Sequence, residues 1–261
     1  MSGEILLNEL IKKLLKTQTG ISLCWTGNDG WLLGAQKHLI AFDLDFCSEE
    51  RISLPPLPLG DVANALDWLL ITHGHGDHFN SDTCRYLAEH SQCKFLLPES
   101  CIAQQKEAGL PAERVRFVAP GLEIALEPWL NVKTIRAIHG HKLHSVYEHA
   151  NLLDCGYVVE FNARTVFQPG DSVLLQQHLE LAPMDVLMVS PTEHNTHING
   201  SITMIKSIRP KNIIAQHFGT YHVNEDNAFW TQGFPDELLQ ALPMEDRGKF
   251  IKPVQGSLIR V

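Results

Sequence analysis

The sequence predicts an α+β protein built from layered β-sheets with helices on their outer faces. Short apolar stretches separated by turn residues fill the first part of the chain, as in consecutive antiparallel strands, and strands and helices mix from residue 69 onward. The chain has 261 residues and 44% hydrophobic content, which suits one large domain with a substantial core or two fused half-units. We expect a single domain over residues 1–261.

The N-terminal segment predicts an amphipathic helix over residues 4–16. Its leucine and isoleucine side chains recur at helical spacing, with lysines between them. We expect this helix, within residues 1–19, to pack on the domain. Packing on a second subunit and attachment to a membrane are the alternatives.

The remaining elements follow from apolar stretches and the turn residues that separate them. A proline-rich loop interrupts the order at residues 55–58. A helix is expected to begin with Asn80 or Ser81 as its N-cap and to run to about Gln92. The predicted strands cover 21–25, 31–33, 38–42, 69–72, 94–97, 115–118, several segments of 122–167, 185–190 and 212–216, with further helices over 99–108 and 201–208.

Composition excludes several classes of function. The formal net charge is −9 and no run of Lys or Arg occurs, so a general affinity for nucleic acid or anionic membranes has no electrostatic basis. The start lacks the pattern of a secretory signal and no run is long enough to span a bilayer, so we expect a cytoplasmic protein. Scattered cysteines without a C-x-x-C pair favour free thiols in a reducing compartment. They are Cys24, Cys47, Cys84, Cys93, Cys101 and Cys155.

One stretch, Thr-His-Gly-His-Gly-Asp-His, crowds ligand-type side chains directly behind an apolar strand. It contains His73, His75, Asp77 and His78. A helix cannot present them together, because residues two apart on a helix point to nearly opposite sides. A strand that runs into a loop with two glycines can, since glycine gives the chain extra backbone freedom. We therefore expect these four side chains to converge in a strand-to-helix loop at a sheet edge.

Three later residues stand at strand ends in the same manner. His139 follows the apolar segment 134–138, Asp171 follows Gly170, and His217 follows the strand 212–216. Imidazole and carboxylate suit zinc, manganese and iron, and the absence of cysteine argues against a structural zinc knuckle. Seven groups are too many for one tetrahedral ion. Two ions bridged by one carboxylate would leave positions open for water, as a catalytic site requires.

Other polar residues compete for places in the site or support it. His222 competes with His217, and His141 and His144 compete with His139; in each case we prefer the residue that directly follows the strand. Asp43 or Asp45 could orient a metal-bound imidazole, and turn formation is the alternative. The polar loop after the strand 185–190 could bind substrate oxygen or supply a general acid, and a solvent-facing loop is the alternative. The candidates for contacting the substrate or supporting the metal ligands are His194, His197, Asn199 and His222.

Together, these residues resemble a known pattern. Thr72-His73-x-His75-x-Asp77-His78, followed by His139, Gly170-Asp171 and His217, is similar in order and spacing to the metallo-β-lactamase-fold hydrolases over roughly residues 20 to 220. The resemblance implies a four-layer αβ/βα sandwich with the site at one edge between two sheets. It also implies that one metal is held by His73, His75 and His139, a second by Asp77, His78 and His217, that Asp171 bridges them, and that Asp77 orients the nucleophile.

The resemblance implies a metal-dependent hydrolase. Two divalent ions would lower the pKa of a bound water from 15.7 to about 7 and supply hydroxide as the nucleophile. The segments Phe167-Gln168-Pro169-Gly170-Asp171-Ser172 and Arg209 to Thr220 are most similar to the branch that contains L-ascorbate-6-phosphate lactonase. We expect a small cytosolic lactone, ester or amide as substrate. The alternatives are a phosphodiesterase acting on a nucleotide or phospholipid head group, and a non-catalytic scaffold.

A subunit contact is a separate expectation. Trp230 and Phe234, near Phe229, could build a homo-oligomer interface together with the N-terminal helix. Cover over the protein's own core or pocket is the alternative.

Overall fold

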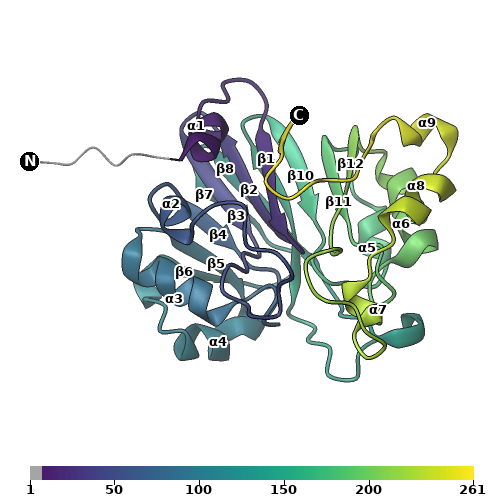
Figure 1. Cartoon of the computed structure of the whole chain (residues 1–261), viewed down its shortest axis with the longest axis horizontal. Coiled ribbons are helices and arrows are strands. Elements are labelled where there is room, and N and C mark those ends of the chain that lie inside the picture. The colour runs from purple at the N-terminus through teal and green to yellow at the C-terminus, as the bar shows by residue number, and fades with distance from the viewer. Residues whose placement is uncertain (1–7) are drawn as a thin grey trace, which may run out of the picture.

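Two seven-stranded sheets form the centre of the molecule (Figure 1), which a computed structural model describes over residues 8–261. The first sheet contains, in spatial order, β14 (Leu258–Arg260), β1 (Ser22–Gly27), β2 (Gly30–Ala35), β3 (His38–Phe42), β4 (Trp68–Leu70), β5 (Lys94–Pro98) and β6 (Val115–Val118). The second contains β13 (Phe250–Ile251), β12 (Asn212–Ala215), β11 (Val186–Val189), β10 (Arg164–Gln168), β9 (Cys155–Phe161), β8 (Leu130–Arg136) and β7 (Glu123–Glu127).

Each sheet is half antiparallel and half parallel. In the first sheet, β14, β1, β2 and β3 pair antiparallel, as the sequence predicted for residues 21–42, and β3 to β6 pair parallel. In the second, β7 to β10 pair antiparallel and β10 to β13 pair parallel. Most of the polar site residues lie in loops that follow the parallel strands: His73 to His78 follow β4, Asp171 follows β10 and His217 follows β12.

Helices cover the outer face of both sheets, as Figure 1 shows. Residues of α1, α2 and α3 pack in a core cluster with the first sheet, and residues of α6 and α8 pack with the second. A third cluster fills the space between the sheets. The prediction of a four-layer sandwich is thus confirmed. The helices are α1 (Glu9–Leu15), α2 (Leu59–Ala63), α3 (Ser81–His90), α4 (Ile102–Glu107), α5 (Gln176–Leu179), α6 (His197–Ile208), α7 (Ala228–Thr231), α8 (Pro235–Ala241) and α9 (Met244–Arg247), with 3₁₀ turns at Glu99–Cys101, Ala112–Arg114 and Lys142–His144.

Local sequence patterns predicted the start of one helix correctly and missed the start of another. Asn80 caps α3 by accepting a hydrogen bond from the Thr83 amide at 2.9 Å, as predicted, because a cap satisfies an amide that has no partner within the helix. The helix predicted over 201–208 begins four residues earlier, at His197. The short elements α2, α5, α7, α8, α9, β13 and β14 were not predicted.

The N-terminal helix packs on the first sheet. Ile11 and Leu14 are fully buried in the core cluster that this sheet shares with its outer helices, and α1 contacts β2. Burying such a side chain contributes about 1.5–3 kcal/mol. The predicted start of this helix at residue 4 lies outside the described residues.

Other expectations from composition can be compared with the structure. All six cysteines are unpaired, as predicted, and only Cys47 is exposed. Within residues 8–261, no helix is long and apolar enough to cross a membrane.

Candidate metal centre

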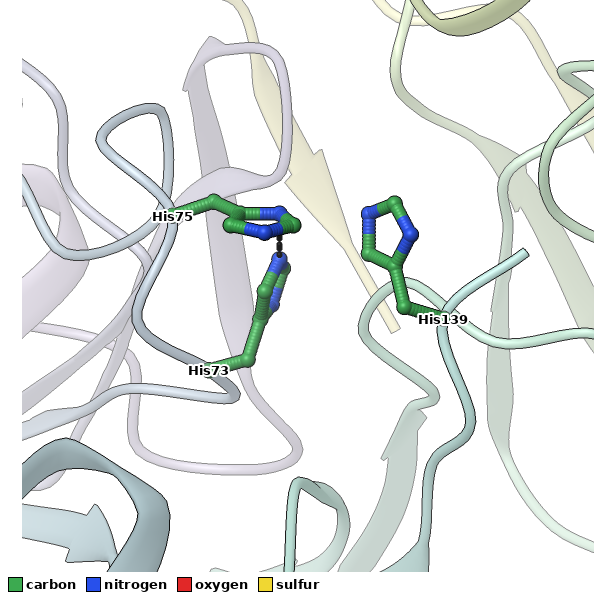
Figure 2. A group of neighbouring side chains, drawn as sticks. All are labelled: His73, His75 and His139. Carbon is green, nitrogen blue, oxygen red and sulfur yellow. Dashed lines mark hydrogen bonds between the residues drawn. The ribbon is translucent and has the colours of Figure 1, made fainter. Parts of the chain in front are cut away.

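Three histidines form the first group of ligand-type side chains, which we call the histidine trio: His73, His75 and His139. One ring nitrogen of each lies within 4.8 Å of the others, and Figure 2 shows His73 and His75 on one loop with His139 facing them from another segment. His73 Nε2 and His75 Nδ1 are 3.1 Å apart. His139 Nδ1 donates to the Gly140 carbonyl at 2.7 Å, which leaves its Nε2 as the acceptor nitrogen, as a metal ligand requires.

Four other residues form a second group, which we call the buried group: Asp29, His78, Asp171 and His217. Their ligand atoms all lie within 4.8 Å of one another, and all four residues are buried. They come from the β1–β2 turn and from the loops after β4, β10 and β12. His217 Nε2 is 3.4 Å from Asp29 Oδ2 and 3.3 Å from Asp171 Oδ2.

The buried group contains polar atoms that the described protein leaves without a hydrogen bond. Asp29 Oδ2 and His78 Nε2 both lack a partner. A buried polar atom without a partner costs about 1–3 kcal/mol, and such atoms are rare. A divalent cation between them would satisfy both, and the mixture of imidazole and carboxylate suits zinc, manganese or iron. The residues therefore fit a metal ion.

Asp171 lies where the two groups meet. Its Oδ2 is 3.5 Å from His139 Nε2, 3.5 Å from His78 Nε2 and 2.7 Å from His194 Nε2. Its Oδ1 accepts from Asn195 Nδ2 at 2.9 Å. Asp171 thus contacts the trio and the buried group at once, which is the position of a bridging ligand.

Asp77 lies beside the buried group, and its side chain is more exposed to solvent than those of Asp29 and Asp171. Its side chain is 17% exposed, and its Oδ2 is 3.5 Å from His78 Nε2 and 3.8 Å from His217 Nε2. Asn28 Nδ2 donates to the same oxygen at 3.0 Å. Burial opposes the charged form, but His78 and His217 hold the pKa of Asp77 well below its usual value. Asp77 therefore stays ionised.

Asp43, and not Asp45, orients an imidazole of the site. His78 Nδ1 lies 2.9 Å from Asp43 Oδ2, and the amide and hydroxyl of Thr72 both donate to the same carboxylate at 2.8 Å. This contact fixes which nitrogen of His78 faces the ligand atoms. Asp45 instead accepts from the Tyr221 hydroxyl at 2.7 Å, away from the imidazoles.

Two glycines allow the loops of the site to approach each other. A Cβ on Gly140 would lie 1.9 Å from the His194 carbonyl oxygen, and one on Gly170 would lie 2.7 Å from Thr72 Cβ. Gly170 also has a φ of 64°, which favours glycine. The loops that carry His139 and Asp171 can therefore pack only with glycine at these positions.

The pKa values of His73 in the trio and His217 in the buried group are shifted in opposite directions. Burial lowers the pKa of His73 well below its usual value, and His78 lowers it further, so this imidazole is neutral. In the buried group the carboxylates outweigh burial: Asp171 and Asp29 raise the pKa of His217 to about 9. Burial in turn raises the pKa of Asp29.

A cavity of about 390 Å³ opens over the candidate ligands. Three aromatic side chains, Tyr147, Phe229 and Trp230, form much of its wall. Of the three aromatic residues considered for a subunit contact, Phe229 and Trp230 line this cavity. Phe234 instead lies against His197. The cavity's other lining residues are His75, Gly76, Asp77, His139, His141, Asp171 and His194.

The structure does not bring every candidate residue to this centre. His197 and Asn199 line a separate cavity, because α6 begins at His197 and carries both residues away from the ligand atoms. His222 is exposed, and its carbonyl accepts from Asn227 Nδ2. His141 lines the 390 Å³ cavity but does not join the trio, and the side chain of His144 lies outside what the structure describes.

Asp29 was not predicted as a site residue from the sequence. It lies in the segment Gly27-Asn28-Asp29-Gly30, whose composition is typical of a β-hairpin turn. A polar residue at a strand end was a sufficient clue elsewhere in the chain. Here the turn composition explained the aspartate without a ligand role.

Comparisons with known proteins identify the family of the chain. The beta-lactamase superfamily domain matches residues 42–218. A protein of Desulforamulus reducens named a metal-dependent hydrolase is 22% identical over 242 residues, 89% of this chain and all of that protein. An N-acyl-phosphatidylethanolamine-hydrolyzing phospholipase D of Caenorhabditis elegans is 23% identical over 241 residues, 78% of this chain and 65% of that protein.

Solved structures share the fold. Igni18, a metallo hydrolase of the archaeon Ignicoccus hospitalis, superposes with a TM-score of 0.72 at 18% identity, covering 92% of this chain and 98% of that one. The fold and the enzyme class predicted from the sequence are therefore confirmed, whereas the lactonase-like branch gains no support from these matches.

Proposed function

The chain belongs to the beta-lactamase superfamily of metal-dependent hydrolases, and we propose that it uses two divalent ions to hydrolyse a small lactone, ester or amide. One observation carries the proposal. The trio and the buried group meet at Asp171, directly beneath a cavity of about 390 Å³. Ligand groups that share a carboxylate under an open cavity are arranged for a substrate to reach both.

In this proposal each group holds one ion. The trio would hold the first ion, Asp77, His78 and His217 would hold the second, and Asp171 would lie between them. Bound zinc, manganese or iron would supply a hydroxide nucleophile at neutral pH and stabilise negative charge on the substrate oxygen.

The chain's own residues position and move protons. Asp77 is ionised, partly exposed and lines the cavity, so its carboxylate can orient the attacking oxygen and accept its proton. His194 Nε2 lies 2.7 Å from Asp171 and keeps that carboxylate in place.

The cavity wall favours a neutral substrate. Among the described residues that line it there is no Arg or Lys, while Tyr147, Phe229 and Trp230 supply apolar surface. A phosphate group is usually met by Arg, Lys or a helix N-terminus. This is our reason for preferring a lactone, ester or amide, with a lactonase-like activity as the working example.

A phosphodiester is the second candidate. The C. elegans relative is named for hydrolysis of a phospholipid. Lys142 Nζ lies 5.1 Å from the centre of the Phe229 ring, at the edge of the cavity, where it could meet a phosphate. A non-catalytic scaffold is the third candidate, and a site with every ligand type in place argues against it.

The expected partner is a small molecule. A net charge of −9 gives nucleic acid no electrostatic attraction. We retain a cytoplasmic location and a homo-oligomer as hypotheses, the latter testable by light scattering.

The first test combines metal analysis with substrate screening. We expect about two ions per chain after loading with zinc, manganese or iron, and turnover of p-nitrophenyl esters or aryl lactones above that of bis-p-nitrophenyl phosphate. Asp77→Ala should abolish turnover without changing the circular dichroism spectrum. Asp82→Ala, an exposed carboxylate on α3, is the matched control.

Three results would contradict parts of the proposal. Turnover of phosphodiesters alone would favour the second candidate. A fully active Asp77→Ala protein would remove the proton role of this residue. A wild-type protein that binds none of the three metals would remove the proposed function altogether.

A further inference from the structure

We propose that Asp29 is a direct ligand of the ion in the buried group, completing a set of four with His78, Asp171 and His217. The proposal rests on the metal-dependent function proposed above and goes beyond it. The pattern that the chain shares with metallo-β-lactamase-fold hydrolases begins at His73 and gives no role to the β1–β2 turn.

The turn that carries Asp29 is tied to the site by its backbone. The Asn28 carbonyl accepts from the His217 amide at 3.2 Å and from Trp25 Nε1 at 2.8 Å, and the Asn28 amide donates to the Thr220 hydroxyl at 2.6 Å. The Asp29 carbonyl accepts from Gln168 Nε2 at 3.2 Å. Asp29 is therefore held against the loops that carry Asp171 and His217, and a ligand held in advance loses little entropy on binding.

The two carboxylate oxygens of Asp29 have different surroundings. Oδ1 accepts from the Ser190 hydroxyl at 3.2 Å, and Ser190 is held by Gln216 Nε2 at 3.1 Å. Oδ2 has no hydrogen-bond partner and lies 3.4 Å from His217 Nε2 and 3.9 Å from His78 Nε2. One oxygen fixed by the protein and one aimed at neighbouring ligands is how metal-binding carboxylates are usually oriented.

His78 supplies an independent observation. Its Nδ1 is engaged by Asp43 at 2.9 Å, so Nε2 is the nitrogen that faces the group. Nε2 is fully buried and also lacks a partner. The two unpartnered atoms lie 3.9 Å apart, so one cation bound beside them could take both as ligands.

The comparison with Asp77 explains what Asp29 adds. Asp77 Oδ2 already accepts from Asn28 Nδ2 at 3.0 Å, and its side chain lines the cavity. With Asp29 in place, two imidazoles and two carboxylates supply four ligands, the usual number for zinc. Asp77 lies on the cavity side of the same group, where it can also orient the attacking oxygen and accept its proton.

Zinc binding by four proteins tests the inference: wild type, Asp29→Asn, Ser190→Ala and Asp77→Asn. Each is stripped with a chelator and titrated with zinc alone, followed by elemental analysis after desalting. Asparagine has the shape of aspartate but no charge. We expect Asp29→Asn to lose one of two ions, or to bind it about 100-fold more weakly. Loss of a residue that only supports a metal ligand lowers metal affinity by about 10–100-fold, so this effect lies at or beyond the upper end of that range. Ser190→Ala removes only the hydrogen bond to Oδ1 and should cost about 10-fold.

Crystals of the zinc-loaded wild-type protein give a readout that needs no variant. An anomalous peak about 2.0–2.2 Å from Asp29 Oδ2 supports the inference. An ion held by His78, Asp171 and His217 with Asp29 Oδ2 outside its coordination sphere overturns it, even if Asp29→Asn fails to fold.

The two proposals fail in different ways. If Asp29→Asn keeps both ions with wild-type affinity, Asp29 only positions the turn, and the proposed function stands. If the wild type binds no zinc, manganese or iron, both proposals are wrong.

Discussion

The histidine trio and the buried group differ in charge and in access to solvent. The trio has no carboxylate of its own, and His75 is exposed. The buried group has two carboxylates among four buried residues, of which Asp171 lines the cavity. Two adjacent candidate sites in one protein thus have unlike surroundings.

The difference indicates unlike duties for the two ions. A group without carboxylates attracts a divalent cation less strongly and exchanges it more readily, whereas two buried carboxylates attract it strongly. The trio faces the cavity through His75 and His139, where a substrate would arrive. We therefore expect the buried group to hold its ion more tightly and the trio to act on the substrate.

Removing Asp171 should have the largest effect, because this member of the buried group also contacts His139 of the trio. Asp171→Ala should lower kcat/KM by about 10³-fold or more, since a metal supplies several kcal/mol of stabilisation to the transition state and about 1.4 kcal/mol is a factor of ten. Elemental analysis should show loss of both ions. Retention of either ion at full occupancy would mean that the groups are independent.

The two groups should lose their ions separately. His73→Ala is expected to remove the ion of the trio and leave one ion per chain, with activity reduced by about 100-fold, whereas His78→Ala should remove the tighter ion. Metal content after dialysis against a chelator gives the order of affinity. If His73→Ala loses the ion that the wild type keeps longest against the chelator, the proposed order of affinities is wrong.

Asp43, which orients His78 of the buried group, can be changed without removing any ligand. Asp43→Asn should reduce metal affinity or activity by about 10–100-fold, because Asp43 fixes the orientation of His78. Asp45→Asn is the matched control, since Asp45 contacts Tyr221 instead. Equal effects of the two variants would indicate a general loss of stability, which thermal unfolding measures.

Zinc affinity of the buried group should rise with pH. The pKa of His217 is raised to about 9 by Asp171 and Asp29, so below pH 9 zinc must displace its proton, and affinity should rise about tenfold per pH unit for each proton released. His73 stays neutral, because burial holds its pKa well below the usual value. Calorimetry from pH 6 to 8 on His73→Ala reports the buried group, and on His78→Ala the trio. A flat profile for His73→Ala would contradict this assignment.

The smallest effect is expected at the cavity wall. Phe229→Ala should raise KM by about 5–10-fold with little change in kcat or metal content, because it removes apolar contact of about 1–1.5 kcal/mol with the substrate. The measurement is steady-state kinetics on the best substrate from the screen. A change in kcat alone would place Phe229 in the chemical step.

Local patterns in the sequence determined much of this protein. Period-two stretches and turn residues located most strands, and the rule that polar residues follow buried strands selected His73, His139 and Asp171 as candidates. They succeeded because strand ends are encoded by neighbouring residues, and because strands of a layered sheet end at a common edge.

Only the tertiary structure decided how these residues act together. The choice of Asp43 over Asp45, of His194 over His197, and the entry of Asp29 into the buried group all depend on distances between segments far apart in the chain. Residues 29 and 217 meet because two sheets pack face to face and bring their loops to one edge. No local pattern encodes that approach, since it is set by the packing of side chains between the sheets.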